Sequence, residues 1–184
     1  MFSEGKRIDD GLMFDAIQTY LQENWLVAFS TPFYIVLILL EVVVSQYQKR
    51  RYYSIQETAI NLWLNLVNTL LGVTIKVFVL LLLGYFASFH FMEISAPILY
   101  WFLLFIGVDF CFYLEHRSEH FSRILWAIHV THHSSQEYNL TTGFRSSVFR
   151  PFVSFWFFIP LVFFGFKPLD ILLMDAICQI YGIL

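Results

Sequence analysis

The 184-residue sequence has few charged side chains for its length. Asp, Glu, Lys and Arg make up 14% of the residues, against about a quarter in soluble proteins. The mean hydropathy is +0.65, and the chain contains 22 Phe, 10 Tyr and 5 Trp residues. This leaves too little polar surface to cover a soluble core. The composition therefore excludes an ordinary soluble domain and indicates a membrane protein.

Cysteine and clustered basic residues are also scarce. Cys111 and Cys178 each lie inside an apolar run, which argues against a disulfide framework. The 11 Lys and Arg residues form no stripe suited to phosphates, so we expect no nucleic-acid partner. No cleavable signal peptide is expected, because acidic residues follow the first cations and the first apolar run begins near Trp25.

Long apolar runs predict the membrane-spanning helices. Residues 25–45 are a first span of about 20 residues, enough to cross a hydrocarbon core ~30 Å thick. Residues 59–89 and 96–114 predict two more spans, and residues 151–184 predict a helical hairpin of two short arms around the tip GFKP. No internal repeat appears. The prediction is one all-α domain, residues 1–184, built as a multi-pass transmembrane helical bundle.

Polar side chains interrupt the second of these runs. Asn61, Asn65 and Asn68 follow helical spacing, so one face is polar and is predicted to meet another helix. Lys76 lies near the middle of the run. Because a charge in mid-span costs about 2.5–3.5 kcal/mol on insertion scales, Lys76 is expected to face a partner or a cavity.

The cations predict the orientation of the chain. Segments 47–56 and 115–150 hold seven of the eleven, namely Lys49, Arg50, Arg51, Arg117, Arg123, Arg145 and Arg150. The positive-inside rule places both segments in the cytoplasm and residues 89–95 on the far side. We expect an integral protein of a bacterial inner membrane or of the endoplasmic reticulum.

Histidine is concentrated in one strip, HRSEHFSRILWAIHVTHH, which runs from His116 to His133 and holds five of the six histidines. His116 and His120 are four residues apart and would share one face of a helix. His129 and His133 repeat this spacing, with His132 three residues after His129. Because neutral imidazole is the commonest ligand for borderline transition metals, the segment 115–150 is predicted to bind metal.

The residues alone leave several metal chemistries open. HRSEH satisfies the zinc-protease pattern H-x-x-E-H, in which Glu119 would activate a zinc-bound water, but three histidines then stay unexplained. A haem bundle would place single histidines deep in facing spans, whereas these histidines cluster at one membrane edge. A metal transporter would need ligands along a path through the bilayer, and only Lys76, Asp109 and Asp175 are expected that deep. A cluster with more histidines than one tetrahedral zinc can use favours two metals, and nitrogen-rich ligation suits iron.

The two histidine boxes carry a resemblance. HxxxH at 116–120 and HxxHH at 129–133, after an apolar span, resemble the membrane-bound fatty acid hydroxylase and sterol desaturase superfamily. The string DFCFYLEHRSEH…LWAIHVTHHSSQEYNLTTGFR is similar in particular to the branch that contains alkylglycerol monooxygenases. The similarity is strong over residues 109–150 and looser in the surrounding spans.

The resemblance implies a non-haem centre of two iron ions on the cytoplasmic face. Its ligands would include His116, His120, His129, His132 and His133, which match the family's ligands one by one. Such an enzyme uses O₂ and an external electron donor to hydroxylate or desaturate a C–H bond of a lipid substrate.

The family also carries a third HxxHH box, whereas this sequence has no histidine after His133. We therefore expect an N-terminal portion of such an enzyme, and the resemblance does not imply that these residues are active by themselves. The rival hypothesis is a catalytically incomplete membrane protein that binds one metal or serves as a partner subunit.

Four further polar residues flank the boxes. Asp109 shares one helical stripe with His116 and could accept the second ring N–H of a ligand histidine. A polar contact between spans is an equally compatible interpretation of this residue. Glu137, Asn139 and Arg145 follow the second box, where a solvated loop is favoured over a lining of the site.

Overall fold

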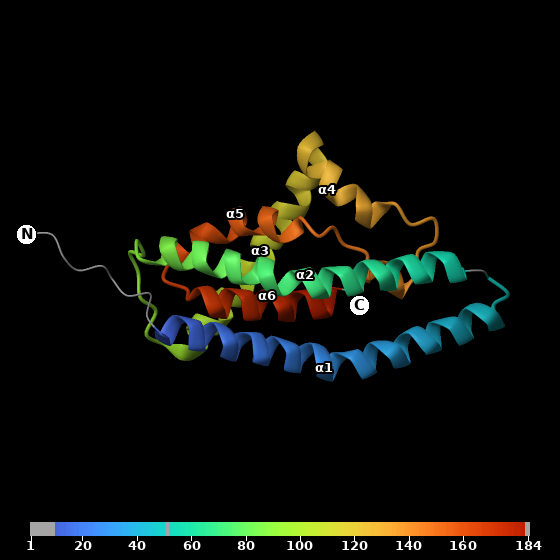
Figure 1. Ribbon diagram of the computed structural model, residues 1–184, viewed down its shortest axis with the longest axis horizontal. Helices are drawn as coiled ribbons and strands as arrows, with labels where there is room; N and C mark the ends of the chain where they lie inside the picture. The colour runs from blue at the N-terminus through green and yellow to red at the C-terminus, as the bar shows by residue number, and fades with distance from the viewer. Residues whose placement is uncertain (1–9, 51, 183–184) are drawn as a thin grey trace, which may run out of the picture.

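The computed structural model describes residues 10–50 and 52–182, without the side chains of residues 10–24, 26–29 and 73. Every regular element in this part of the chain is a helix, which confirms the predicted all-α class (Figure 1). The elements are α1 (Asp10–Tyr47), α2 (Ile55–Ala87), α3 (Pro97–Phe121), α4 (Arg123–His133), the 3-10 helix η1 (Leu140–Phe144), α5 (Arg150–Phe163) and α6 (Pro168–Gly182).

The long helices pack into one bundle. α2 packs on α5, α3 packs on both α5 and α6, and α1 runs along α6. In Figure 1, α4 projects from the body of the bundle at the top of the view, where it continues from the end of α3. The apolar core lies between α2, α3, α5 and α6, and the fully buried side chains of Leu83, Leu104 and Val162 belong to it. Cys111 and Cys178 are both free and buried.

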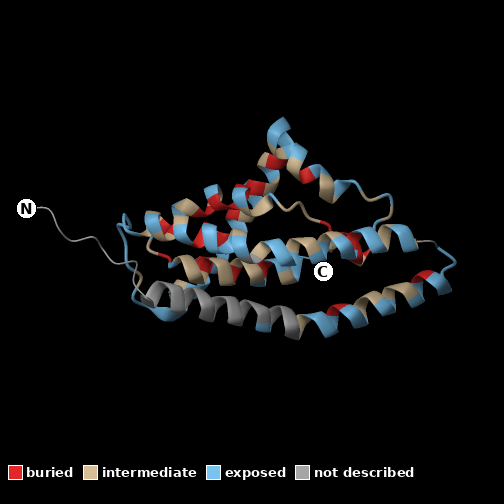
Figure 2. Ribbon diagram, viewed as in Figure 1, coloured by how far each residue is buried: buried red, intermediate tan, exposed pale blue. Residues whose placement is uncertain are grey.

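Among the described residues, two helical stretches are long and apolar enough to cross a membrane, Ser30–Tyr47 of α1 and Pro97–Phe121. α2 is a third if its halves, Ile55–Gly72 and Thr74–Ala87, which meet at 48°, form one span. In the 18-residue apolar window of each of these two stretches, only 11% and 17% of the residues are buried, and Figure 2 shows mainly exposed and intermediate ribbon along the described part of α1. Outward-facing Leu, Val and Phe side chains on such helices suit contact with lipid. The helices are those of a membrane protein.

The predicted spans agree with α1, α2 and α3 in position, but α3 is longer than predicted. It continues past residue 114 to Phe121, so that the first histidine box lies on the same helix as the apolar run. It ends at Ser122, whose extended backbone (φ −95°, ψ 126°) is the single residue between α3 and α4. This break lets α4 turn back, so that the two histidine boxes face each other.

The predicted hairpin is present as α5 and α6, joined at the tip GFKP. Gly165 has φ +86°, and a Cβ atom there would lie 2.0 Å from the carbonyl oxygen of Met92. Glycine is required at this position for its positive φ and for the close approach of the two backbones.

The polar face of α2 was predicted to meet another helix, and its partners are the 3-10 helix η1 and the residues that follow it. Asn61 is fully buried and donates from Nδ2 to the Thr141 hydroxyl in η1, at 3.0 Å. Asn68 donates to the Ser146 carbonyl at 2.7 Å. Since backbone groups of a non-helical segment need partners, Asn68 supplies one to the segment between α4 and α5.

Candidate metal centre

Four histidines converge where α3 meets α4. His116 and His120 come from the last turns of α3, and His129 and His133 come from α4. Each offers one ring nitrogen such that the four atoms all lie within 4.8 Å of one another. The Nε2 atoms of His116 and His120 are 3.3 Å apart, and those of His129 and His133 are 3.0 Å apart. The doubled four-residue spacing therefore produces one cluster.

The cluster is buried on one side and open on the other. His129 is 7% exposed, His116 is half-buried, and His120 and His133 are exposed. The Trp126 ring stacks on the ring of His133, with the centroids 5.5 Å apart. The protein thus fixes the inner half of the cluster more tightly than the outer half.

Glu119 holds the most buried histidine. Its Oε2 atom lies 2.7 Å from Nδ1 of His129, and the carboxylate is 2% exposed. In its ionised form Glu119 can only accept this hydrogen bond, so that Nδ1 of His129 carries the proton and Nε2 keeps its lone pair. The second oxygen, Oε1, is buried without a hydrogen-bond partner among the described residues. Glu119 was expected to activate a zinc-bound water in one sequence interpretation. In the structure it contacts the ring of His129.

Burial and neighbouring rings favour the neutral form of His129 and His133. Burial, reinforced by the neighbouring imidazoles, lowers the pKa of His129 to about 3. Burial also lowers the pKa of His133, and His132 and His120 add to the effect. At neutral pH these rings are uncharged and present lone pairs, which is the form that binds metal.

This donor set fits a transition-metal ion. A nitrogen ligand lies about 2.0–2.1 Å from a bound ion, so two nitrogens on opposite sides are separated by roughly 4.2 Å. The observed limit of 4.8 Å needs only small ring rotations to meet that value. Neutral imidazoles suit iron, zinc, copper and nickel.

His132 lies apart from this four-histidine set. Its Nδ1–H group donates to the carbonyl oxygen of Arg145 at 3.1 Å. This leaves Nε2 free, and the ring centroid is 5.6 Å from that of His129. Of the five histidines named from the sequence, four form the cluster and the fifth stands beside it.

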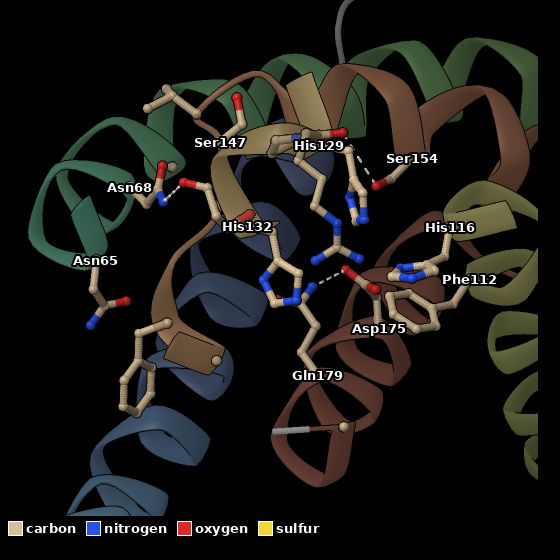
Figure 3. Close-up of a pocket in the computed structure, with 18 of the residues that line it drawn as sticks. Asn65, Asn68, Phe112, His116, His129, His132, Ser147, Ser154, Asp175 and Gln179 are labelled. Carbon is tan, nitrogen blue, oxygen red and sulfur yellow. Dashed lines mark hydrogen bonds between the residues drawn. The ribbon is translucent and has the colours of Figure 1, made fainter. Parts of the chain in front are cut away.

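A cavity of 690 Å³ adjoins the cluster. Figure 3 shows His116, His129 and His132 near the same space, with Asp175 and Gln179 of α6 on another side of it. Apolar side chains from α2, α5 and α6 line other parts of the wall: Ile75, Val79, Phe158 and Leu172. Lys76 also lines the cavity, as expected for a charge in mid-span.

A buried ion pair lies beside the cluster and was not anticipated from the sequence. Glu115, 1% exposed, accepts from Nε of Arg150 at 3.2 Å and from the Ser154 hydroxyl at 2.7 Å. The Arg150 guanidinium also lies 5.2 Å from the centre of the Phe112 ring. Both members of the pair directly adjoin functional segments, since Glu115 precedes His116 and Arg150 begins α5. A pairing of residues 35 positions apart leaves no local sequence signal.

Asp109 is exposed and accepts a hydrogen bond from the Tyr181 hydroxyl of α6. No hydrogen bond to a histidine is described for it. Its role at a ligand histidine stays a prediction.

The loop after the second box is partly buried, and the interpretation of it as solvated is wrong for two of its residues. Asn139 is buried and caps η1, accepting from the Thr141 N–H at 3.0 Å. Arg145, 8% exposed, is paired with Glu57 of α2 at 2.8 Å. A polar sequence with Asn, Thr and Gly is typical of exposed loops, and only the partners on α2 show otherwise.

The fold and the cluster together define a class, a helical membrane protein with a polyhistidine site at the end of an apolar helix. Residues 101–184 match the fatty acid hydroxylase family. The alkylglycerol monooxygenase of Danio rerio is 36% identical over 135 residues. Those of Xenopus tropicalis and Homo sapiens are 49% and 48% identical over 63 and 64 residues. The chain belongs to the fatty acid hydroxylase family, in the branch of the alkylglycerol monooxygenases.

Each match covers a larger share of this chain than of the relative. The match with the Danio rerio protein covers 72% of this chain, and the matches with the Xenopus tropicalis and Homo sapiens proteins cover 34% and 35% of it. The same three matches cover 30%, 14% and 14% of the length of these relatives. The chain therefore spans less than a third of the length of the curated relatives it matches. No solved structure matches it.

Proposed function

We propose that this chain forms the metal site of a membrane-bound, non-haem iron oxygenase that hydroxylates or desaturates a lipid at a C–H bond. The observation that carries the proposal is the convergence of four histidine nitrogens within 4.8 Å, beside a cavity of 690 Å³ whose walls are partly apolar. Membership of the fatty acid hydroxylase family supports the class of reaction. The alkylglycerol monooxygenases support a lipid as the substrate.

The proposed ligands are His116, His120, His129 and His133 for one ion, with His132 contributing from the cavity side. Two iron ions bound here would supply the activation of O₂, with electrons from an external donor. The residues around the histidines would hold the imidazole rings in place. Glu119 keeps Nε2 of His129 unprotonated, and the carbonyl of Arg145 does the same for Nε2 of His132. The apolar cavity walls would hold an acyl chain and exclude water from the reacting atoms.

Oxygen uptake tests the proposed function. The chain is purified in detergent, supplied with Fe²⁺ and a chemical reductant, and offered a lipid ether, a fatty acid or a sterol. Oxygen uptake that depends on one of these lipids and disappears in His132→Ala would support the oxygenase, because that substitution removes a nitrogen facing the cavity. Removal of iron with a chelator should abolish the same signal.

The alternative function, a protein that binds a single metal or serves as a partner subunit, has one specific observation in its favour. The four-histidine set suffices for one ion, and His132 stands outside it. Bound iron without lipid-dependent oxygen uptake would support this alternative over the oxygenase.

The proposed topology is multi-pass, with the histidine cluster on the cytoplasmic face. Its support is the excess of cations in segments 47–56 and 115–150. In intact cells, an impermeant thiol reagent should label Ser95→Cys more readily than Ser118→Cys. The two native cysteines are buried and should give little background. Preferential labelling of Ser118→Cys from outside would reverse the orientation.

A further inference from the structure

Arg145 joins the second histidine box to α2. Its Nε atom donates to the carbonyl oxygen of Thr131 at 3.1 Å, next to His132. Its NH1 group donates to Glu57 at 2.8 Å and to the Asn61 amide oxygen at 3.3 Å. One guanidinium therefore connects the last turn of α4 with two residues of the facing helix.

The main chain of the same residue holds a histidine ring. The carbonyl oxygen of Arg145 accepts from Nδ1 of His132 at 3.1 Å. A backbone carbonyl has no proton to give, so this bond fixes the tautomer of His132 and leaves Nε2 with a lone pair. The position of that carbonyl depends on the path of the backbone at residue 145.

Further hydrogen bonds fix the positions of the residues that Arg145 contacts on α2. Glu57 accepts a further hydrogen bond from the Ser135 hydroxyl at 2.9 Å, and its own N–H donates to the Ser54 cap of α2. Asn61 is fully buried and donates to Thr141 of η1. The guanidinium is thus fixed from both sides of the loop, in a fork geometry that lysine cannot reproduce.

We propose that Arg145 is a positioning residue that sets the orientation and tautomer of His132 through its carbonyl, with Glu57 and Asn61 as its anchor on α2. The inference rests on the proposed metal-binding role of His132. It adds that residues of α2 set the ligand geometry at the second histidine box. Glu57 precedes His132 by 75 residues in the chain. Arg145 itself touches neither metal nor substrate.

Co²⁺ binding tests the proposal, because the visible absorption of bound Co²⁺ reports the number and geometry of its ligands. In Arg145→Lys we expect the Co²⁺ affinity to fall by about 10-fold, the lower end for loss of a group that orients a ligand. The absorption band should also shift. Arg123→Lys is the matched control, since Arg123 is exposed at the start of α4, and it should change neither quantity.

The decisive comparison uses a background without the histidine. If Arg145 acts through His132, Arg145→Lys should have no further effect on Co²⁺ affinity or spectrum in a His132→Ala chain. Equal effects in both backgrounds would overturn the proposal, because the arginine would then act on the fold as a whole. Helical circular dichroism of the metal-free proteins shows whether each variant folds.

Glu57→Gln carries the test if Arg145→Lys does not fold. It keeps an oxygen acceptor and the shape of the side chain, and we expect a smaller, roughly threefold loss of Co²⁺ affinity with the same direction of band shift. A folded Glu57→Gln with unchanged affinity and spectrum would overturn the proposal. Failure of the unsubstituted chain to bind Co²⁺ would instead contradict the proposed function.

Discussion

Replacement of Arg150 by methionine is expected to lower the free energy of unfolding by about 3–5 kcal/mol, the usual cost of leaving one member of a buried ion pair without its partner. Glu115 is 1% exposed and would keep only the Ser154 hydroxyl. Chemical denaturation in detergent, followed by helical circular dichroism, measures the loss.

Two further variants test whether the broken ion pair causes this loss of stability. Arg117→Met removes an exposed cation that contacts Tyr113, and it should cost less than about 1 kcal/mol. The double variant Glu115→Leu with Arg150→Met should recover most of the lost stability, because it removes the unpaired charge as well. A double variant as unstable as Arg150→Met alone would show that the ion pair is not the cause.

Replacement of Glu119 by leucine is expected to lower metal affinity by about 10- to 100-fold, as for other groups that orient a ligand histidine. Without the carboxylate, His129 loses the acceptor at 2.7 Å that keeps its proton on Nδ1. Titration with Co²⁺ or Zn²⁺ in detergent gives the affinity. Ser118→Ala, one residue away on α3, is the matched control and should bind metal like the unsubstituted chain.

Asp109→Asn belongs in the same titration. A fall of about 10- to 100-fold would support the sequence-based hypothesis that Asp109 orients a histidine. An unchanged affinity would assign its carboxylate to the contact with Tyr181 alone. An unchanged affinity in Glu119→Leu would contradict the structural argument for Glu119.

The histidine cluster could be predicted because its geometry is local. The spacing of His116 and His120 is the period of one helix turn, and the same holds for His129 and His133. Sequence alone also located the apolar helices, since their length is set by the membrane rather than by their neighbours.

The supporting contacts could not be predicted, because they join distant parts of the chain. The pairs Arg145 with Glu57 and Arg150 with Glu115 are 88 and 35 residues apart. Glu119 shows a related limit. Its sequence context suggested a direct role on a metal-bound water, but the direction of its side chain follows from the turn at Ser122, which brings α4 back over it.

The unbroken course of α3 from its apolar run into the first histidine box has a geometric consequence. Pro97 and His116 are separated by 19 helical steps, and at 1.5 Å per residue this is about 29 Å, close to the thickness of a hydrocarbon core. The length of α3 up to the first ligand therefore matches the thickness of the hydrocarbon core. In the proposed topology, this length sets how far the ligands lie from the opposite surface of the bilayer, and one additional turn inserted in the apolar part of α3 would carry them about 5 Å farther toward the water.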